Sequence, residues 1–170
     1  MFTLRFSEDD IGLWAAKNTS QDDLVFLNQI GPSVQKRGYM IRSEFLEMCE
    51  WKSPRTKSLC AKNSDDYIKE ITQISFASHY EPLRIQVLTL LVGVSWATAS
   101  VILHFCCVNQ YPILDFRALW SLNATKPTSY SFPFWWSYTE QCRGLASRNN
   151  ISMRILDRAL WQYSKENQTT

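Results

Sequence analysis

An apolar stretch runs from Val87 to Val108 and contains no Asp, Glu, Lys or Arg. Its length would suit a membrane span, which needs roughly 20 apolar residues. However, Gly93 interrupts the stretch, Ser95 follows closely, and further Ser, Thr and His side chains dilute its apolar character. No cluster of Lys or Arg marks either flank, as would be typical of a membrane helix. We therefore expect a buried helical hairpin with its turn at Gly93, and no membrane partner.

Helix signals recur along the rest of the chain, whereas the alternation of apolar and polar residues typical of strands is nearly absent. Ser64, Ser95 and Asp115 each precede an apolar run and are good N-cap residues. The pair Gly31 and Pro32 is expected to break the chain. We predict an all-α protein of about nine or ten short helices. Residues 1–170 are expected to form a single helical domain, or two lobes with a cleft between them.

The composition predicts a folded monomer in a reducing compartment. Hydrophobic residues make up 45% of the chain, which is enough for a core and argues against disorder. The five cysteines are an odd number, and the start, MFTLRFSEDD, is too acidic for a secretory leader, so we expect cytoplasmic thiols. With two histidines and no Cys-x-x-Cys pair, we expect no zinc site, no iron–sulfur cluster and no other cofactor. Because the net charge is only +2, a DNA-binding surface would have to come from local clusters.

The sequence LVGVS, which begins at Leu91, predicts a particular kind of turn. Glycine permits a tight corner between two helices. The second helix, WATASVILHF, then presents N–H groups without helical partners at the positive end of its dipole. Such a helix end can bind a phosphate without reading base sequence. The pattern alone is not specific, because any tight corner between helices can carry a glycine.

The distance from this turn to the next acid makes the pattern more specific. LVGVSWATA occupies residues 91–99, and the sequence ILD ends at Asp115, 18 positions after Ala97. The chain thus resembles the helix-hairpin-helix DNA glycosylases, whose hairpin reads L-P-G-V-G-x-K-T-A and whose catalytic aspartate follows the lysine at the same spacing. The positions that match are Gly93, Val94, Thr98 and Ala99. The resemblance covers about 35 residues, and it implies that residues 83–120 hold the hairpin and the catalytic aspartate.

Three positions depart from the family pattern. Val92 replaces the usual proline, and Ser95 replaces the second glycine, where serine is a good helix cap. Ala97 occupies the position at which bifunctional members carry a lysine that forms a Schiff base. Without an amine there, no covalent imine forms from this position. The resemblance therefore implies a monofunctional enzyme in which water is the nucleophile.

In this family, Asp115 would be the catalytic residue. Breaking an N-glycosidic bond develops oxocarbenium character on the sugar. A carboxylate beside C1′ stabilises that charge and activates a water, once the target nucleotide has left the base stack. The residues by themselves also fit a simpler role, in which Asp115 only caps the helix FRALWSL and contributes about 1 kcal/mol to stability.

Basic residues between Val34 and Lys62 form a first candidate surface for the DNA backbone. Within this region, EWKSPRTK places Trp51 beside Lys52, with Arg55 at a proline turn. A mixture of an aromatic ring, basic residues and a rigid turn suits a loop that contacts DNA. An ordinary solvated loop with one anchored tryptophan explains the same residues.

The last helix carries the second candidate surface. Its basic stripe consists of Arg154, Arg158, Trp161 and Lys165, which share one narrow face. The opposite, buried face is expected to consist of Ile155, Leu156, Ala159, Leu160 and Tyr163, with Asp157 paired to a neighbouring arginine. A solvated helix face is again the simpler alternative.

The predicted site residues thus fall into three groups. The catalytic candidate is Asp115. The candidates for DNA binding are Gly93, Val94, Ser95, Thr98, Lys52, Arg55, Arg154, Arg158 and Lys165. The candidates for a pocket around the extruded base are Trp51, Trp96, Tyr39 and Trp161. No metal ligands are predicted.

Three functional hypotheses follow. The first is a monofunctional glycosylase acting on double-stranded DNA. Its setting would be repair of a damaged base, or defence against phages whose DNA carries modified bases such as glucosylated hydroxymethylcytosine. The second is a helix-hairpin-helix DNA-binding protein without catalysis, in which Asp115 only caps a helix. The third is a helical interaction protein with no role in nucleic-acid binding, whose binding would not weaken as salt rises.

Overall fold

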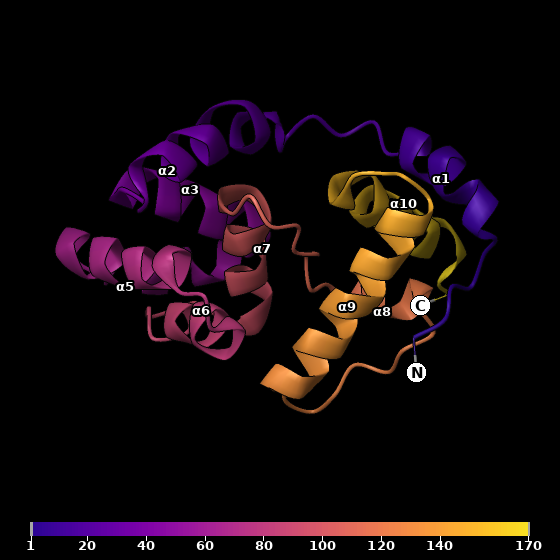
Figure 1. Ribbon diagram of the computed structural model, residues 1–170. Coiled ribbons are helices and arrows are strands. Elements are labelled where there is room, and N and C mark those ends of the chain that lie inside the picture. The colour runs from indigo at the N-terminus through magenta and orange to yellow at the C-terminus, as the bar shows by residue number, and fades with distance from the viewer. Residues whose placement is uncertain (1, 170) are drawn as a thin grey trace. The chain divides into compact units, whose positions relative to one another are not determined.

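The computed structural model describes residues 2–169, and these residues form ten α-helices and no strand. The prediction of an all-α protein with about nine or ten short helices is therefore confirmed. The chain divides into two compact units (Figure 1). One unit is Asp22–Asn109, here called the central unit. The other, here called the terminal unit, joins the residues before Asp22 to those from Gln110 onward.

The central unit contains six of the helices. Their bounds are α2 (Gly31–Arg37), α3 (Arg42–Lys52), α4 (Lys57–Cys60), α5 (Asp65–Ala77), α6 (Glu81–Leu88) and α7 (Trp96–Cys106). Helix α7 is the most buried of them, and most of its side chains are shielded from solvent. It packs against α2, α3 and α6, while α5 packs against α3 and α6. The apolar stretch of the sequence is thus the centre of this unit's core.

The terminal unit contains the other four helices, α1 (Ile11–Lys17), α8 (Phe116–Ser121), α9 (Phe132–Arg148) and α10 (Met153–Asn167). Helix α10 packs against the other three. The first residues of the chain lie against the end of α8, because the Thr3 and Arg5 amides donate to the Leu122 and Ser121 carbonyls at 3.0 and 2.9 Å. Segments from both ends of the sequence therefore share one core.

The chain continues as a helix through Gly31 and Pro32, where the sequence predicts a break. A π-helical turn, Phe26–Ile30, leads directly into α2, and the Gly31 amide donates to the Phe26 carbonyl. A proline inside a helix lacks an N–H and crowds the preceding turn, and the wider π turn is a common way to accommodate such a defect. The prediction of a break is wrong, because the chain passes through Gly31 and Pro32 as a helix with one π turn.

The helical hairpin predicted at Gly93 is present as α6, a turn and α7. Ser64, Ser95 and Asp115 are the N-caps of α5, α7 and α8, as predicted, and each side chain accepts a hydrogen bond from the first turn of its helix. Within the part of the chain that the structure describes, no helix combines the length and the apolar character required to cross a bilayer.

Gly31 is required by close packing. A Cβ built on Gly31 would lie against two backbone oxygens, that of Phe105 and, at 2.8 Å, that of Phe26. We expect Gly31→Ala to lower the free energy of unfolding by about 1–3 kcal/mol, since backbone atoms cannot move aside cheaply.

The matched control is Gly12→Ala in α1, where the added methyl group meets nothing within 4 Å. By helix propensity alone this change raises stability by up to about 1 kcal/mol. Urea unfolding followed by circular dichroism measures both variants, and equal effects at the two sites would contradict the packing argument.

Candidate functional site

The turn between α6 and α7 has the geometry that the glycine predicts. Gly93 has a φ of 85°, in the left-handed region that favours glycine. The Val94 amide donates to the Leu91 carbonyl at 3.0 Å and closes the turn. Ser95 then caps α7, because its Oγ accepts from the Thr98 amide at 3.4 Å. The chain therefore turns sharply and starts a capped helix within three residues of Gly93.

A buried asparagine that the sequence does not single out holds this turn from behind. Asn63, which is 3% exposed, accepts from the Val92 amide through Oδ1 and donates to the Val92 carbonyl through Nδ2, both at 2.9 Å. Its Nδ2 also donates to the Cys60 carbonyl at 2.9 Å. One side chain thus satisfies both polar groups of a turn residue 29 positions away.

The exposure of the turn residues divides them into two kinds. Val94 and Thr98 are 7% and 1% exposed, so their side chains belong to the core and do not face a ligand. Ser95 is exposed and Gly93 is half-buried. The amides of the first turn of α7 have no acceptors within the helix and lie at the positive end of its dipole. This corner can therefore bind an anion such as a phosphate through its backbone.

The other candidates in the central unit have mixed environments. Trp51 is half-buried, and its ring packs edge-on against Phe26 and Phe105 with centroids 5.6 and 5.7 Å apart. The Arg37 guanidinium and the Lys69 ammonium each lie 5.1 Å from the centroid of the Tyr39 ring. The remaining candidates are Lys52 and Trp96, which are half-buried, and Arg55, which is exposed. Trp51 is thus part of the aromatic core, whereas Arg55 is open to a ligand.

In the terminal unit, Asp115 lies where a buried segment meets a helix. Tyr111 and the three residues after it are buried, and Asp115 itself is half-buried. Its Oδ1 accepts from the Arg117 amide at 2.9 Å, which makes it the N-cap of α8. Burial raises the pKa of the Tyr130 hydroxyl, and the negative charge of Asp115 raises it further. A tyrosine hydroxyl that stays protonated therefore lies within electrostatic range of this carboxylate.

Arg117, which no sequence pattern singles out, connects Asp115 with two of the predicted site residues, Trp161 and Lys165. The Arg117 guanidinium lies 5.5 Å from the centroid of the Trp161 ring, and the Lys165 ammonium lies 5.1 Å from the same centroid. Two cations therefore share one indole ring next to the start of α8. Such a group, which we call the Trp161 cation group, suits contact with a phosphate backbone.

The other residues singled out on α10 lie in mixed environments. The Arg158 guanidinium donates to the Ser20 carbonyl at 3.2 Å within the same unit, and Arg154 is half-buried. Ile155, expected in the core, is 39% exposed. Asp157, for which a neighbouring arginine is the expected partner, is 5% exposed and accepts from the Ile113 amide. The buried face of α10 is thus rotated toward Asp157.

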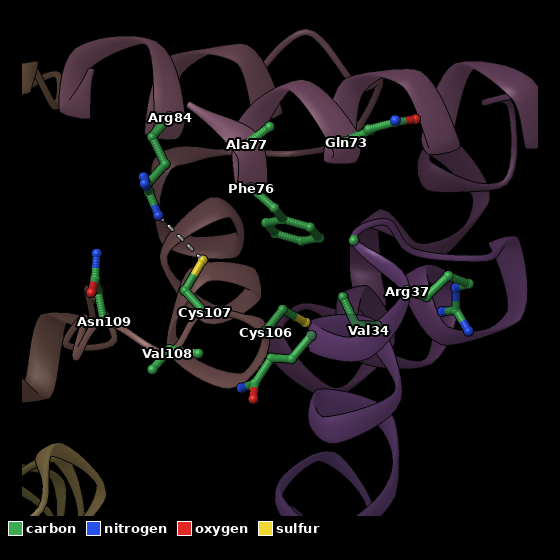
Figure 2. Close-up of a pocket in the computed structure, with 12 residues that line it drawn as sticks. Val34, Arg37, Gln73, Phe76, Ala77, Arg84, Cys106, Cys107, Val108 and Asn109 are labelled. Carbon is green, nitrogen blue, oxygen red and sulfur yellow. Dashed lines mark hydrogen bonds between the residues drawn. The ribbon is translucent and has the colours of Figure 1, made fainter. Parts of the chain in front are cut away.

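The central unit also contains a cavity of about 380 Å³, between α2, α5, α6 and the end of α7 (Figure 2). The Phe76 ring and the Cys106 and Cys107 side chains line it, with Arg37 and Arg84 at its edges. Both guanidiniums have carboxylate partners. Arg37 forms an ion pair with Glu44, and Nε of Arg84 lies 3.9 Å from Oε2 of Glu81. The cavity therefore lacks the excess positive charge that an anionic ligand requires, and no predicted site residue lines it.

Comparison of the chain with protein-family models, with curated proteins and with solved structures finds no match.

All five cysteines lie in the described part of the chain as thiols, and only Cys107 is not fully buried. Within residues 2–169, no group of three or more His, Cys, Asp and Glu side chains is arranged to hold a metal ion. Burial raises the pKa of Cys107 to about 11, although the charge and hydrogen bond of Arg84 partly oppose this increase. At neutral pH the Cys107 side chain is therefore a thiol and a weak nucleophile.

We expect iodoacetamide to label the native protein slowly at pH 7 and about tenfold faster for each pH unit up to about pH 10, as the thiolate fraction grows. Mass spectrometry locates the label, and Cys107→Ser should abolish labelling of the folded chain, while all five thiols of wild type react in denaturant. Rapid labelling of Cys107 at pH 7 would contradict the raised pKa.

The conformation and packing of Gly93 lead to a second prediction. A Cβ on Gly93 would lie 2.8 Å from Sγ and 2.9 Å from N of Cys60. Gly38 has the same φ of 85°, but a Cβ there meets nothing within 4 Å. Gly38→Ala should therefore lose about 1 kcal/mol through backbone strain alone. Gly93→Ala should lose about 1–3 kcal/mol more because it is also overpacked.

Chemical denaturation of the two variants measures this difference directly. If Gly93→Ala is no more destabilising than Gly38→Ala, the turn is not packed against Cys60 as described.

Proposed function

We propose that this chain is a monomeric, cytoplasmic, monofunctional DNA glycosylase that hydrolyses the N-glycosidic bond of an extruded damaged or modified base. One observation carries the proposal. A left-handed glycine turn leads into a serine-capped helix, and 18 positions after Ala97 a half-buried aspartate opens the next helix. The turn is suited to holding a phosphate, and the aspartate is suited to stabilising a positive charge on a sugar.

In this proposal the backbone around Gly93 and the first turn of α7 bind a DNA phosphate. The Trp161 cation group and exposed Arg55 add contacts that do not depend on base sequence. Val94 and Thr98 act indirectly, because their buried side chains hold the turn in shape. DNA binding by such contacts should weaken steeply as the salt concentration rises.

The reaction requires only Asp115 and a water molecule. The bond between C1′ and the base nitrogen breaks, and the bonding electrons leave with the base, which is then protonated. The carboxylate of Asp115 stabilises the oxocarbenium and accepts a proton from the water whose oxygen bonds to C1′. The products are a free base and an abasic site. Because Ala97 has no amine, the chain forms no imine at this position and does not cut the strand from it.

One observation favours a second candidate function, a DNA-binding protein without catalysis. Oδ1 of Asp115 already accepts from the Arg117 amide, which is a complete structural role for a helix cap. In that case the hairpin still binds phosphates, but no base is released.

Asp115→Asn separates the two functions, because asparagine is an equally good N-cap but cannot act as an anion or a base. We expect the variant to lose about 10²–10⁴-fold in the excision rate while it binds duplex DNA as tightly as wild type. The assay incubates the protein with duplexes that carry deaminated, alkylated, oxidised or glucosylated bases. Alkali then cleaves the strand at abasic sites, and fluorescence anisotropy measures binding.

Asp10→Asn serves as the control, since Asp10 is an exposed aspartate that directly precedes α1. It should leave both excision and binding unchanged. Excision that survives in Asp115→Asn would remove Asp115 from the mechanism. Binding without excision on every duplex would favour the non-catalytic function, and strand cleavage without alkali would contradict the role assigned to Ala97.

A further inference from the structure

Two buried side chains hold the peptide groups of one residue just before Asp115. The Ile113 amide donates to Oδ1 and Oδ2 of Asp157 at 3.3 and 3.4 Å, and the Ile113 carbonyl accepts from the Tyr138 hydroxyl at 2.8 Å. Asp157 is 5% exposed and Tyr138 is fully buried. Both polar groups of a residue two positions before Asp115 are therefore fixed by side chains from α9 and α10.

Helix α9 also holds the start of the segment that leads to Asp115. Nε of Arg143 donates to the Gln110 carbonyl at 2.8 Å, and its guanidinium lies 4.7 Å from the centroid of the Tyr111 ring. The Tyr111 ring in turn stacks on Trp135, with centroids 5.7 Å apart. The segment has no helical or strand hydrogen bonds, so these side chains fix its path.

The Tyr138 hydroxyl is suited to a permanent role as donor. Burial raises the pKa of Tyr138 well above its ordinary value, and the neighbouring Cys142, Asp157 and Asp115 side chains raise it further. The hydroxyl therefore keeps its proton at neutral pH and can donate a hydrogen bond. Asp157 accepts a main-chain N–H, and burying such a group is tolerable only when it is hydrogen-bonded.

We propose that Tyr138 and Asp157 are positioning residues that hold the main chain at Ile113 and thereby set the direction of the Asp115 carboxylate. The inference rests on the proposed function, since the orientation of Asp115 matters for the reaction only if Asp115 stabilises the oxocarbenium. A catalytic group displaced by about 1 Å can lose as much as 10²-fold in rate. The two residues do not touch the substrate in this account.

Tyr138→Phe tests the inference because it removes one hydroxyl and keeps the ring. Tyr163→Phe is the matched control, since the Tyr163 hydroxyl also donates to a backbone carbonyl of the terminal unit, that of Arg5, at 3.0 Å. On a duplex that wild type processes, we expect Tyr138→Phe to lose about 10- to 100-fold in kcat with KM unchanged, at a temperature at which all variants are fully folded. We expect Tyr163→Phe to keep the wild-type kcat.

The two variants of Asp157 separate positioning from a general effect on stability. Asp157→Asn keeps an acceptor for the Ile113 amide and should retain most of the rate, whereas Asp157→Leu has a similar shape without an acceptor and should lose it. A lower melting temperature with an unchanged kcat in Tyr138→Phe and Asp157→Leu would show that these residues only stabilise the fold, and it would overturn the inference.

Amide hydrogen exchange provides a readout that does not depend on activity. The Arg117 amide donates to Asp115, so its protection reports how firmly the carboxylate is held. Tyr138→Phe should raise exchange at the Ile113 and Arg117 amides by about tenfold or more, and Tyr163→Phe should not. If Arg117 keeps its protection in Tyr138→Phe, the inference is wrong.

A wild-type chain that excises no base would overturn the proposed function, and the exchange result would still decide whether Tyr138 and Asp157 orient Asp115.

Discussion

Buried backbone N–H and carbonyl groups must find partners, and this constraint governs the segment that leads to Asp115. Residues 111–114 are buried but form neither helix nor strand, so they cannot satisfy one another in a regular ladder. Side chains from α9 and α10 take the place of that ladder. The direction in which the chain enters α8, and with it the position of Asp115, follows from those contacts.

In the turn before α7, a buried side chain likewise holds the backbone of an irregular segment. The side-chain amide of Asn63 pairs with both polar groups of Val92, as the peptide group of a neighbouring strand would. A side chain at position 93 would push the turn away from Cys60, so glycine is required there for its packing as well as for its positive φ. In both segments a buried polar side chain with a fixed geometry gives an irregular stretch of chain a single conformation.

Several features could be predicted from the sequence because their causes are local. Ser64, Ser95 and Asp115 cap helices with hydrogen bonds to amides two or three residues away, so the relevant atoms are always neighbours. The prediction of a break at Gly31 and Pro32 failed for the opposite reason. The helix continues through Gly31 with one π turn, and the carbonyl of Phe105, more than seventy residues along the chain, lies where a side chain on Gly31 would be.

The sequence by itself determined the helical class, the caps and the turn at Gly93, since each depends on residues within one or two turns of each other. The spacing from that turn to Asp115 is read directly from the sequence. Only the tertiary structure showed that Asn63, Tyr138 and Asp157 support these two segments. Their partners lie 29, 25 and 44 positions away, and hydrophobic periodicity carries no information about such pairs. A charged side chain such as Asp157 usually faces water, but here it is buried and accepts a hydrogen bond from the Ile113 amide.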